Sequence, residues 1–217
     1  MTVRDALAWL TESLTLHGFA SAALDAELLV AAALRTSKEE LFARPERVFA
    51  PSRREVLREF LKRRANHEPV AYITKRKAFF GRDFSVNEHV LIPRPETEML
   101  IDETVVRLTK ERRCVVADVG TGSGCLAITL AKELPLARLI ATDISRGALV
   151  VAQANAEEYR VRSRISFLQG NLLSPIAGRH VDLVVANLPY VPDAEVRANP
   201  DLAYEPLLAL RGQYGPD

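Results

Sequence analysis

The chain has 217 residues, of which 48% are hydrophobic and 26% charged, so it has room for one large domain or two smaller ones. Its 29 Lys and Arg residues balance 28 Asp and Glu residues, which argues against a strongly basic nucleic-acid-binding protein and against general attraction to membranes. The start, MTVRDALAWLTESL, does not resemble a signal peptide, and no later stretch is long enough to span a bilayer, so we expect a cytoplasmic location.

The first third of the chain has the apolar spacing of helices. One face is predicted at Val3, Leu7, Leu10 and Leu14, and a second at Leu24, Leu28 and Ala31. The S-x-x-E patterns that begin at Ser37 and Ser52 are capping boxes and predict two further helices, the last of which should stop before Pro69. We therefore predict a small helical domain over residues 1–66.

A hairpin and a linker are predicted over residues 67–94. The stretch VAYITKRKAFFGRDFSV has aromatic and β-branched clusters around a basic centre and Gly81, which favours a hairpin. LIPRPETE then places two prolines around Arg94, which predicts a rigid extended linker and a helix beginning near Glu96. The basic stretch from Arg53 to Arg82 is interpreted as a solvated face, with a surface for an acidic partner as the alternative.

Residues 95–217 alternate between short apolar runs and helix-length segments. The predicted strands are CVVADVG, ARLIATD, RISFLQG and VDLVVAN, and such runs are typical of a parallel sheet covered on both faces. Cys114 and Cys125 fall in the first strand and the following helix start, where they act as small core residues. The four histidines have no metal-ligand spacing, so no metal site is predicted. The fold class is α/β.

The run DVGTGSG follows the first predicted strand and opens a helix. Glycines there let the backbone turn tightly and approach a ligand. Asp143 ends the second strand, where a carboxylate can accept both hydroxyls of a ribose. The spacing is G-x-G-x-G, not the G-x-G-x-x-G of dinucleotide-binding proteins. The predicted site therefore binds a nucleoside cofactor and resembles the first motif of Rossmann-like S-adenosylmethionine-dependent methyltransferases.

The fourth strand ends in Asn187, Leu188, Pro189 and Tyr190. We expect this strand to lie beside the first, which places Asn187 near the methyl group of the cofactor. A planar amine or amide nitrogen is a poor nucleophile, and the Asn187 oxygen and the Leu188 carbonyl could hold its two hydrogens in position. Tyr190 could stack on the planar group, and Pro189 stiffens the loop. Asn187 and Tyr190 are the predicted catalytic residues.

The whole chain resembles the HemK/PrmC family of protein glutamine methyltransferases, through EPVAYIT, FFG, LIPRPETE, DVGTGSGCLAITLAKE, ATDIS and YEPLLAL in order. The resemblance implies methyl transfer from S-adenosylmethionine, giving S-adenosylhomocysteine, to the glutamine amide of the Gly-Gly-Gln motif in peptide-chain release factors. Asn187 to Tyr190 correspond to the substrate motif of the family, and the resemblance implies that the helical domain over residues 1–66 recognises the substrate. The implied cofactor-binding residues are Gly120, Thr121, Gly122, Ser123, Gly124, Asp143, Asn171 and Asn187.

The chain departs from the family pattern at Leu188, which replaces the first proline of Asn-Pro-Pro-Tyr, at Lys75, usually glycine, and at Ala78, usually glutamate. Asn-Leu-Pro-Tyr instead resembles the ribosomal RNA adenine dimethyltransferases. The chain ends at GQYGPD after four readable strands, so we expect the C-terminal strands of the family to be missing and the fourth strand to have an unpaired edge.

Two alternative functions stay open at this point. One is an adenine amino-group methyltransferase acting on RNA or DNA, and the other is an inactive truncated fragment. The expected partner is a peptide-chain release factor, with no direct contact to nucleic acid or membrane, and the expected state is a monomer.

Overall fold

The computed structural model describes residues 1–108 and 113–211, so the final stretch GQYGPD lies outside the described residues. The chain splits into two compact units, Met1–Thr74 and Lys75–Asp217. The division at residues 66 and 94 stays a prediction. Within the described ranges no helix is both long and apolar enough to cross a membrane.

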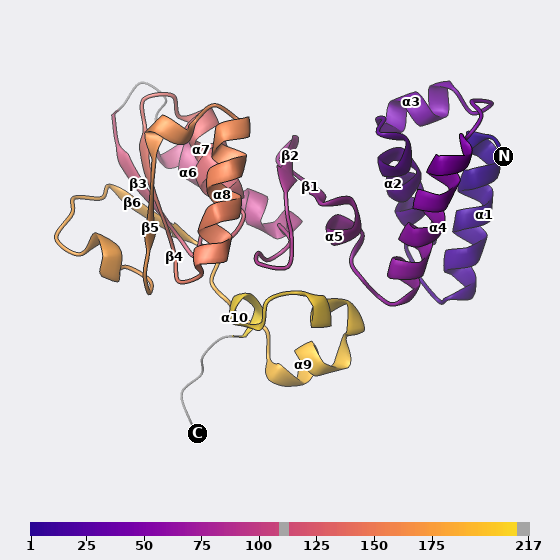
Figure 1. The fold of residues 1–217 in the computed structure, drawn as a ribbon. Coiled ribbons are helices and arrows are strands. Elements are labelled where there is room, and N and C mark those ends of the chain that lie inside the picture. The colour runs from indigo at the N-terminus through magenta and orange to yellow at the C-terminus, as the bar shows by residue number, and fades with distance from the viewer. Residues whose placement is uncertain (109–112, 212–217) are drawn as a thin grey trace. The chain divides into compact units, whose positions relative to one another are not determined.

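The first unit is built from helices (Figure 1). They are α1 (Val3–Leu16), α2 (Ala22–Leu34), α3 (Lys38–Ala43), α4 (Pro51–Ala65) and α5 (Val70–Thr74). The predicted face of α1 is confirmed, since Val3, Leu10 and Leu14 are buried and Leu7 packs against them. Burial of this apolar stripe against α2 and α4 stabilises the unit.

The predicted face of α2 is confirmed at Ala31, which is buried, and is wrong at Leu24 and Leu28. Leu24 and Leu28 are 50% and 37% exposed, and the helix instead buries Ala22, Ala26, Leu29, Val30 and Ala33. The helix is apolar around most of its circumference, so spacing alone cannot select a face. Asp25 lies on the buried face because Arg64 of α4 donates to it from Nε at 2.8 Å. Arg64 is only 5% exposed, so this part of the basic stretch is not a solvated face.

One predicted cap is present and the other is not. The Ser37 hydroxyl accepts the Glu40 amide at the start of α3. By contrast, α4 begins at Pro51, with Ala50 in the N-cap position and no side-chain cap, so the prediction of a cap at Ser52 is wrong. The fixed φ of proline suits the first helical position and sets the start of α4 without a capping hydroxyl.

The second unit contains two sheets with their covering helices (Figure 1). Its helices are η1 (Pro95–Thr97), α6 (Glu98–Arg107), α7 (Cys125–Glu133), α8 (Arg146–Glu158), η2 (Arg162–Arg164), η3 (Ser174–Ile176), α9 (Asp193–Ala198), η4 (Pro200–Tyr204) and α10 (Leu207–Leu210). Its strands are β1 (Arg76–Phe79), β2 (Arg82–Ser85), β3 (Val115–Val119), β4 (Arg138–Asp143), β5 (Ile165–Gln169) and β6 (Leu183–Ala186).

The predicted hairpin is present but shorter than its sequence signal. β1 and β2 pair antiparallel, with Phe79 opposite Arg82. The preceding VAYIT stretch, included in the hairpin prediction, is the helix α5. The carbonyl of Pro69 accepts the amides of Tyr72 and Ile73, which starts a helical turn despite the β-branched composition. Local hydrogen bonding therefore overrides β-propensity here.

The larger sheet has the order β5-β4-β3-β6 and is parallel throughout. The predicted parallel α/β sheet and the placement of the fourth strand beside the first are both confirmed. Cys114 and Cys125 are buried free cysteines, as expected. In a parallel sheet all carboxyl ends lie at one edge, so the segments that follow β3, β4, β5 and β6 are brought together there.

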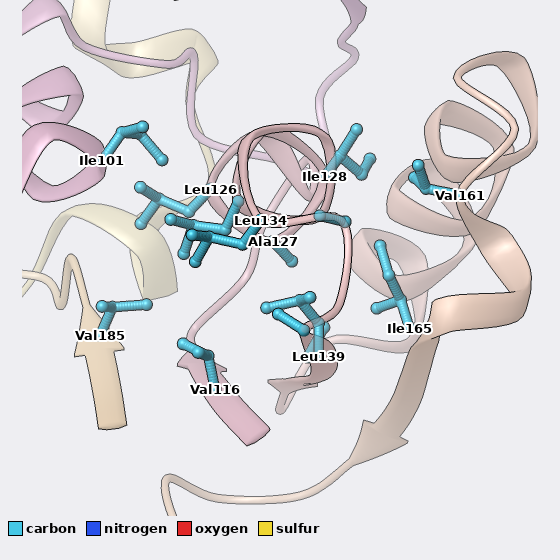
Figure 2. Packing of buried hydrophobic residues seen from close by; sticks show 14 of the residues in the cluster. Ile101, Val116, Leu126, Ala127, Ile128, Leu134, Leu139, Val161, Ile165 and Val185 are labelled. Carbon is cyan, nitrogen blue, oxygen red and sulfur yellow. The ribbon is translucent and has the colours of Figure 1, made fainter. Parts of the chain in front are cut away.

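The main core lies on one face of this sheet (Figure 2). Val116, Leu139, Ile165 and Val185 point toward α7, where Leu126, Ala127 and Ile128 meet them. On the other face Ala117 and Ile140 form a smaller buried cluster with Ile176 of η3. The prediction of helices on both faces is thus met on one face of the described sheet, while the short η3 segment covers part of the other.

Candidate active site

The predicted site residues lie at the carboxyl edge of the parallel sheet. Val119 pairs with Ala186, so Asn187 follows β6 beside the glycine loop that follows β3. Asp143 pairs with Gln169, so Asn171 follows β5 on the other side of Asp143. The tertiary structure therefore places the four segments next to one another, although Val119 and its neighbour Ala186 on β6 are 67 positions apart along the chain.

The glycine loop is held by the neighbouring strand. The amides of Gly120 and Thr121 both donate to the Thr142 carbonyl, each at 2.9 Å. Gly122 has a φ of +54°, and a Cβ built on it would meet nothing within 4 Å, so this turn of the loop borders open space. Backbone in this conformation favours glycine and can approach a ligand closely. The geometry fits the cofactor cradle predicted from the sequence.

The side chains of Thr121 and Ser123 are directed into the protein. Thr121 is 5% exposed, and its hydroxyl donates to Asp118 at 2.6 Å. Ser123 is 2% exposed, and its carbonyl accepts from Asn155. If these two residues contact the cofactor, they do so through backbone groups.

Asp118, the first residue of DVGTGSG, has a structural role that was not predicted from the sequence. It is fully buried, and its Oδ2 accepts both the Thr121 hydroxyl and the Ala127 amide of α7, which ties the loop to the helix. Burial raises the pKa of Asp118 to about 6, and the charge of Asp143 adds to this, while both hydrogen bonds act in the opposite direction. Oδ1 has no hydrogen-bond partner among the described residues.

Asp143 fixes the loop geometry. Its Oδ2 accepts the Gly122 amide at 2.9 Å and its Oδ1 accepts the Ser145 amide at 2.8 Å. A carboxylate oxygen can accept more than one hydrogen bond, so Asp143 can still receive ribose hydroxyls. It therefore orients the loop in addition to its predicted ligand contact.

The segment after β6 presents polar and aromatic groups together. Asn187 is half-buried and donates from Nδ2 to the Thr97 hydroxyl at 2.9 Å. Tyr190 is 63% exposed and Leu188 is 41% exposed. A Cβ on Gly120 would lie 3.4 Å from Leu188 Cδ2, so the leucine side chain borders the glycine loop. The leucine that replaces a family proline thus lies between the predicted cofactor and substrate segments.

The motifs LIPRPETE and YEP meet in the fold. The Glu205 carboxylate is 4% exposed overall, accepts the Ile92 amide at 2.9 Å and forms an ion pair with Arg94. Neither contact could be found from the sequence, because the paired residues are more than 100 positions apart and carry no local pattern.

Asn155 of α8 is another residue that the sequence analysis missed. It is fully buried and bridges the hairpin to the glycine loop. Its Oδ1 accepts the Ser85 amide at 2.9 Å, and its Nδ2 donates to the carbonyls of Ser85 at 3.0 Å and Ser123 at 2.8 Å. Ion pairing of Arg76 with Glu158 adds a second link between the hairpin and α8. An Asn inside a helical pattern was the only available signal.

The remaining groups at the edge suit a nucleoside. Ile144 and Leu172 are 55% and 50% exposed, next to Asp143 and Asn171, and can cover the faces of a base. The side chain of Asn171 is exposed, while its carbonyl accepts the Ser174 amide and hydroxyl. No group of three or more His, Cys, Asp or Glu residues that could hold a metal ion occurs in the described ranges.

Two parts of this chain match known protein families. Residues 5–74 match the family model described as PrmC N-terminal domain, and residues 96–203 match the model described as methyltransferase small domain. The release factor glutamine methyltransferase of Moorella thermoacetica is 41% identical over 218 residues, which span 100% of this chain and 76% of that protein. That of Koribacter versatilis is 43% identical over 196 residues, covering 90% of this chain and 69% of that protein.

A solved structure supports the fold alone. The crystal structure of the hMettl16 catalytic domain in complex with MAT2A 3'UTR hairpin 6 superposes with a TM-score of 0.51 at 19% sequence identity. The superposition covers 69% of this chain and 59% of that one. The parallel sheet therefore has a fold of the methyltransferase type.

Proposed function

The chain belongs to the release factor glutamine methyltransferase family, and on this basis we propose that it transfers a methyl group from S-adenosylmethionine to a glutamine amide nitrogen of a peptide-chain release factor. The glutamine of a Gly-Gly-Gln motif is the proposed acceptor. The single observation that carries the proposal is the position of Asn187, which follows β6 beside the glycine loop with its side-chain amide held by Thr97.

The chain offers a cradle for the cofactor. Gly122 borders open space and Asp143 lies at the end of the neighbouring strand, with Ile144 and Asn171 beside it. When bound there, S-adenosylmethionine supplies an electrophilic methyl group on a sulfonium centre. In this proposal Asp143 accepts the ribose hydroxyls, and Gly120 to Gly124 border the methionine part.

Asn187 and Leu188 position the acceptor nitrogen. The lone pair of an amide nitrogen is delocalised, so its orientation toward the methyl group contributes much of the rate. Since Nδ2 of Asn187 donates to Thr97, its Oδ1 can accept one hydrogen of the substrate amide. The Leu188 carbonyl accepts the other, and the exposed Tyr190 ring packs on the planar group. The nitrogen gains the methyl group and gives up one proton to solvent.

A second candidate is an adenine amino-group methyltransferase, which one observation favours: the sequence Asn-Leu-Pro-Tyr at positions 187–190. Adenine also presents a planar amine. The first unit favours the protein substrate, since residues 5–74 match the PrmC N-terminal model. The monomeric state, the cytoplasmic location and the absence of direct nucleic-acid contact stay predictions.

Radiolabelled methyl transfer by the natural full-length protein tests the proposal. An intact release factor, the same factor with its motif glutamine changed to alanine, free glutamine and ribosomal RNA are offered side by side. We expect label only in the intact release factor. Asn187→Ala should abolish transfer while cofactor affinity stays within about threefold, because Asn187 acts on the acceptor.

Asn66→Ala, the same change in the first unit, is the control variant and should keep the parent rate. Label in RNA adenines and none in the release factor would establish the second candidate instead. Transfer by Asn187→Ala at the parent rate would contradict the role of this residue.

A further inference from the structure

The segment Leu91–Glu98 makes contacts for which the proposed function gives no reason. Its sequence is LIPRPETE, and it carries two prolines and the one-turn helix η1. The Glu98 carboxylate accepts the Phe80 amide of the hairpin at 2.8 Å. Thr97 accepts from Asn187 at 2.9 Å. The segment therefore contacts both the hairpin and the residue that the proposed function assigns to the acceptor.

Thr97 is suited to hold a side chain in place. It is 7% exposed, so water does not compete freely for its hydroxyl, and a hydrogen bond in such a place orients its partner well. Asn187 Nδ2 is the donor in this bond. Asn187 Oδ1 has no hydrogen bond within the described part of the chain and is left to accept from a ligand.

The orientation of Asn187 matters because the two ends of its amide have opposite hydrogen-bonding character. With Oδ1 toward the acceptor, it receives a hydrogen of the substrate nitrogen. With the amide rotated by half a turn, an N–H would face that same N–H and repel it. In the structure Nδ2 is the donor to Thr97, which leaves Oδ1 for the acceptor in the productive rotamer.

The position of Thr97 is itself fixed by buried contacts. Its amide donates to the Arg94 carbonyl at 3.1 Å. Arg94 forms an ion pair with Glu205, and the Glu205 carboxylate also accepts the Ile92 amide at 2.9 Å. The flanking Pro93 and Pro95 restrict the backbone further. The hydroxyl is thus in place before any substrate arrives, which is the condition for preorganised catalysis.

We propose that Thr97 is a positioning residue, which holds the Asn187 side-chain amide so that its oxygen accepts from the nitrogen to be methylated. This inference rests on the proposed function. It gives the LIPRPETE segment a specific role: it fixes Thr97 through Arg94 and Glu205, and Thr97 fixes Asn187.

Two substitutions of Thr97 separate the hydroxyl from the shape of the side chain. Thr97→Val removes the acceptor and keeps the volume, and we expect kcat on the release factor to fall by about 10-fold to 100-fold, the loss for one partly buried hydrogen bond. The KM for the release factor and the affinity for S-adenosylmethionine should change by less than about twofold. Thr97→Ser restores the hydroxyl and should keep kcat within about threefold of the parent.

Thr104→Val is the matched control. Thr104 is 2% exposed on α6, and its hydroxyl donates to the Leu100 carbonyl at 2.6 Å and not to Asn187. The same chemical change there removes a buried hydroxyl without touching the site. We expect kcat to remain at the parent value, which separates loss of positioning from loss of stability.

Amide NMR gives a readout that does not depend on activity. The side-chain NH₂ signals of Asn187, assigned by their absence in Asn187→Ala, should shift in Thr97→Val and keep their positions in Thr97→Ser and Thr104→Val. If Thr97→Val does not fold, Thr97→Ala replaces it with the same expectation.

The outcomes distinguish the two proposals. If the parent enzyme methylates the release factor and the variants without a hydroxyl at position 97 do so with the same kcat, the positioning role is wrong and the proposed function stands. If the parent enzyme transfers no methyl group to the release factor, the proposed function itself fails. A fall in kcat with unchanged KM, together with the NMR shift, supports the role of Thr97.

Discussion

Truncating Asn155 to alanine should loosen the hairpin and the glycine loop at once. This side chain is fully buried and makes three hydrogen bonds, two to Ser85 and one to the Ser123 carbonyl. The backbone groups of Ser85 and Ser123 lose their partner when the amide is removed. Because the contacts join segments 70 and 32 residues apart in sequence, no local contact replaces them.

The expected cost follows from the burial of each group. An unsatisfied buried polar group costs about 1–3 kcal/mol, and the Ser123 residue is 2% exposed, so its carbonyl should contribute near the middle of that range. The two groups of the half-buried Ser85 can partly recover water and should contribute less than about 1 kcal/mol each. The total is about 3 kcal/mol, a large part of the stability of an ordinary domain.

Two measurements test this estimate. Urea unfolding followed by circular dichroism gives the change in the free energy of unfolding. Hydrogen exchange of the Ser85 amide gives the local change, and about 3 kcal/mol corresponds to exchange that is on the order of 100-fold faster. Fluorescence of Trp9, the single tryptophan, which lies in α1, reports on the first unit. Its transition should stay near that of the parent.

Gln153→Ala is the control on the same helix. Gln153 has no side-chain hydrogen bond in the described part of the chain and is partly exposed. We expect it to change stability by less than about 0.5 kcal/mol. Equal unfolding free energies for the two variants, with unchanged exchange at Ser85, would refute the reasoning that Asn155 couples the hairpin to the loop.

Three further predictions concern the cofactor loop. Asp143→Ala should weaken S-adenosylmethionine binding by about 1–3 kcal/mol in calorimetry, because ribose hydroxyls and the Gly122 amide lose a carboxylate acceptor. Tight binding of NAD by the parent protein, in place of S-adenosylmethionine, would contradict the cofactor assignment behind this prediction. Burial raises the pKa of Asp118 from 3.8 to about 6, so its protonated form stabilises the fold fully below pH 3.8, and this contribution is lost as the pH rises through 6. Relative to Asp118→Asn, the parent should therefore lose about 3 kcal/mol of unfolding free energy between pH 3.5 and pH 7, and parallel pH profiles would rule this out. Gly124→Ala should lower the free energy of unfolding in urea by about 2–3 kcal/mol, because its φ is +80° and a Cβ would lie 3.0 Å from that of Ala152. Gly178→Ala is the control: its φ is +77° and a Cβ would meet nothing within 4 Å, so only the backbone strain remains and the loss should be smaller.

Two of the predictions from sequence are wrong, for different physical reasons. Leu24 and Leu28 were expected inside, but α2 is apolar on most sides and packing against its neighbours selects the buried face. Ser52 matches a capping box, yet the preceding Pro51 already occupies the first helical position. The buried face of α2 is thus decided by contacts elsewhere in the chain, whereas the start of α4 is decided by the adjacent proline.

The sequence by itself determined the α/β class, the four strands of the parallel sheet and the segments of the candidate site. These follow from short-range patterns: apolar runs of strand length, glycines where the backbone must turn, and a polar residue at each strand end. The periodicity of α1 and the cap at Ser37 are local in the same sense. Such features are encoded within a few residues, so they can be read without the fold.

Only the tertiary structure decided which groups fix the site in place. Thr97 meets Asn187 across 90 positions, Glu205 meets Ile92 across 113, and Asn155 meets Ser85 across 70. Each of these contacts joins elements that the sheet and its helices bring together, and none leaves a periodic signal in the chain. These hydrogen bonds are buried or partly buried, which strengthens them, and burial is a property of the packed fold and not of the local sequence.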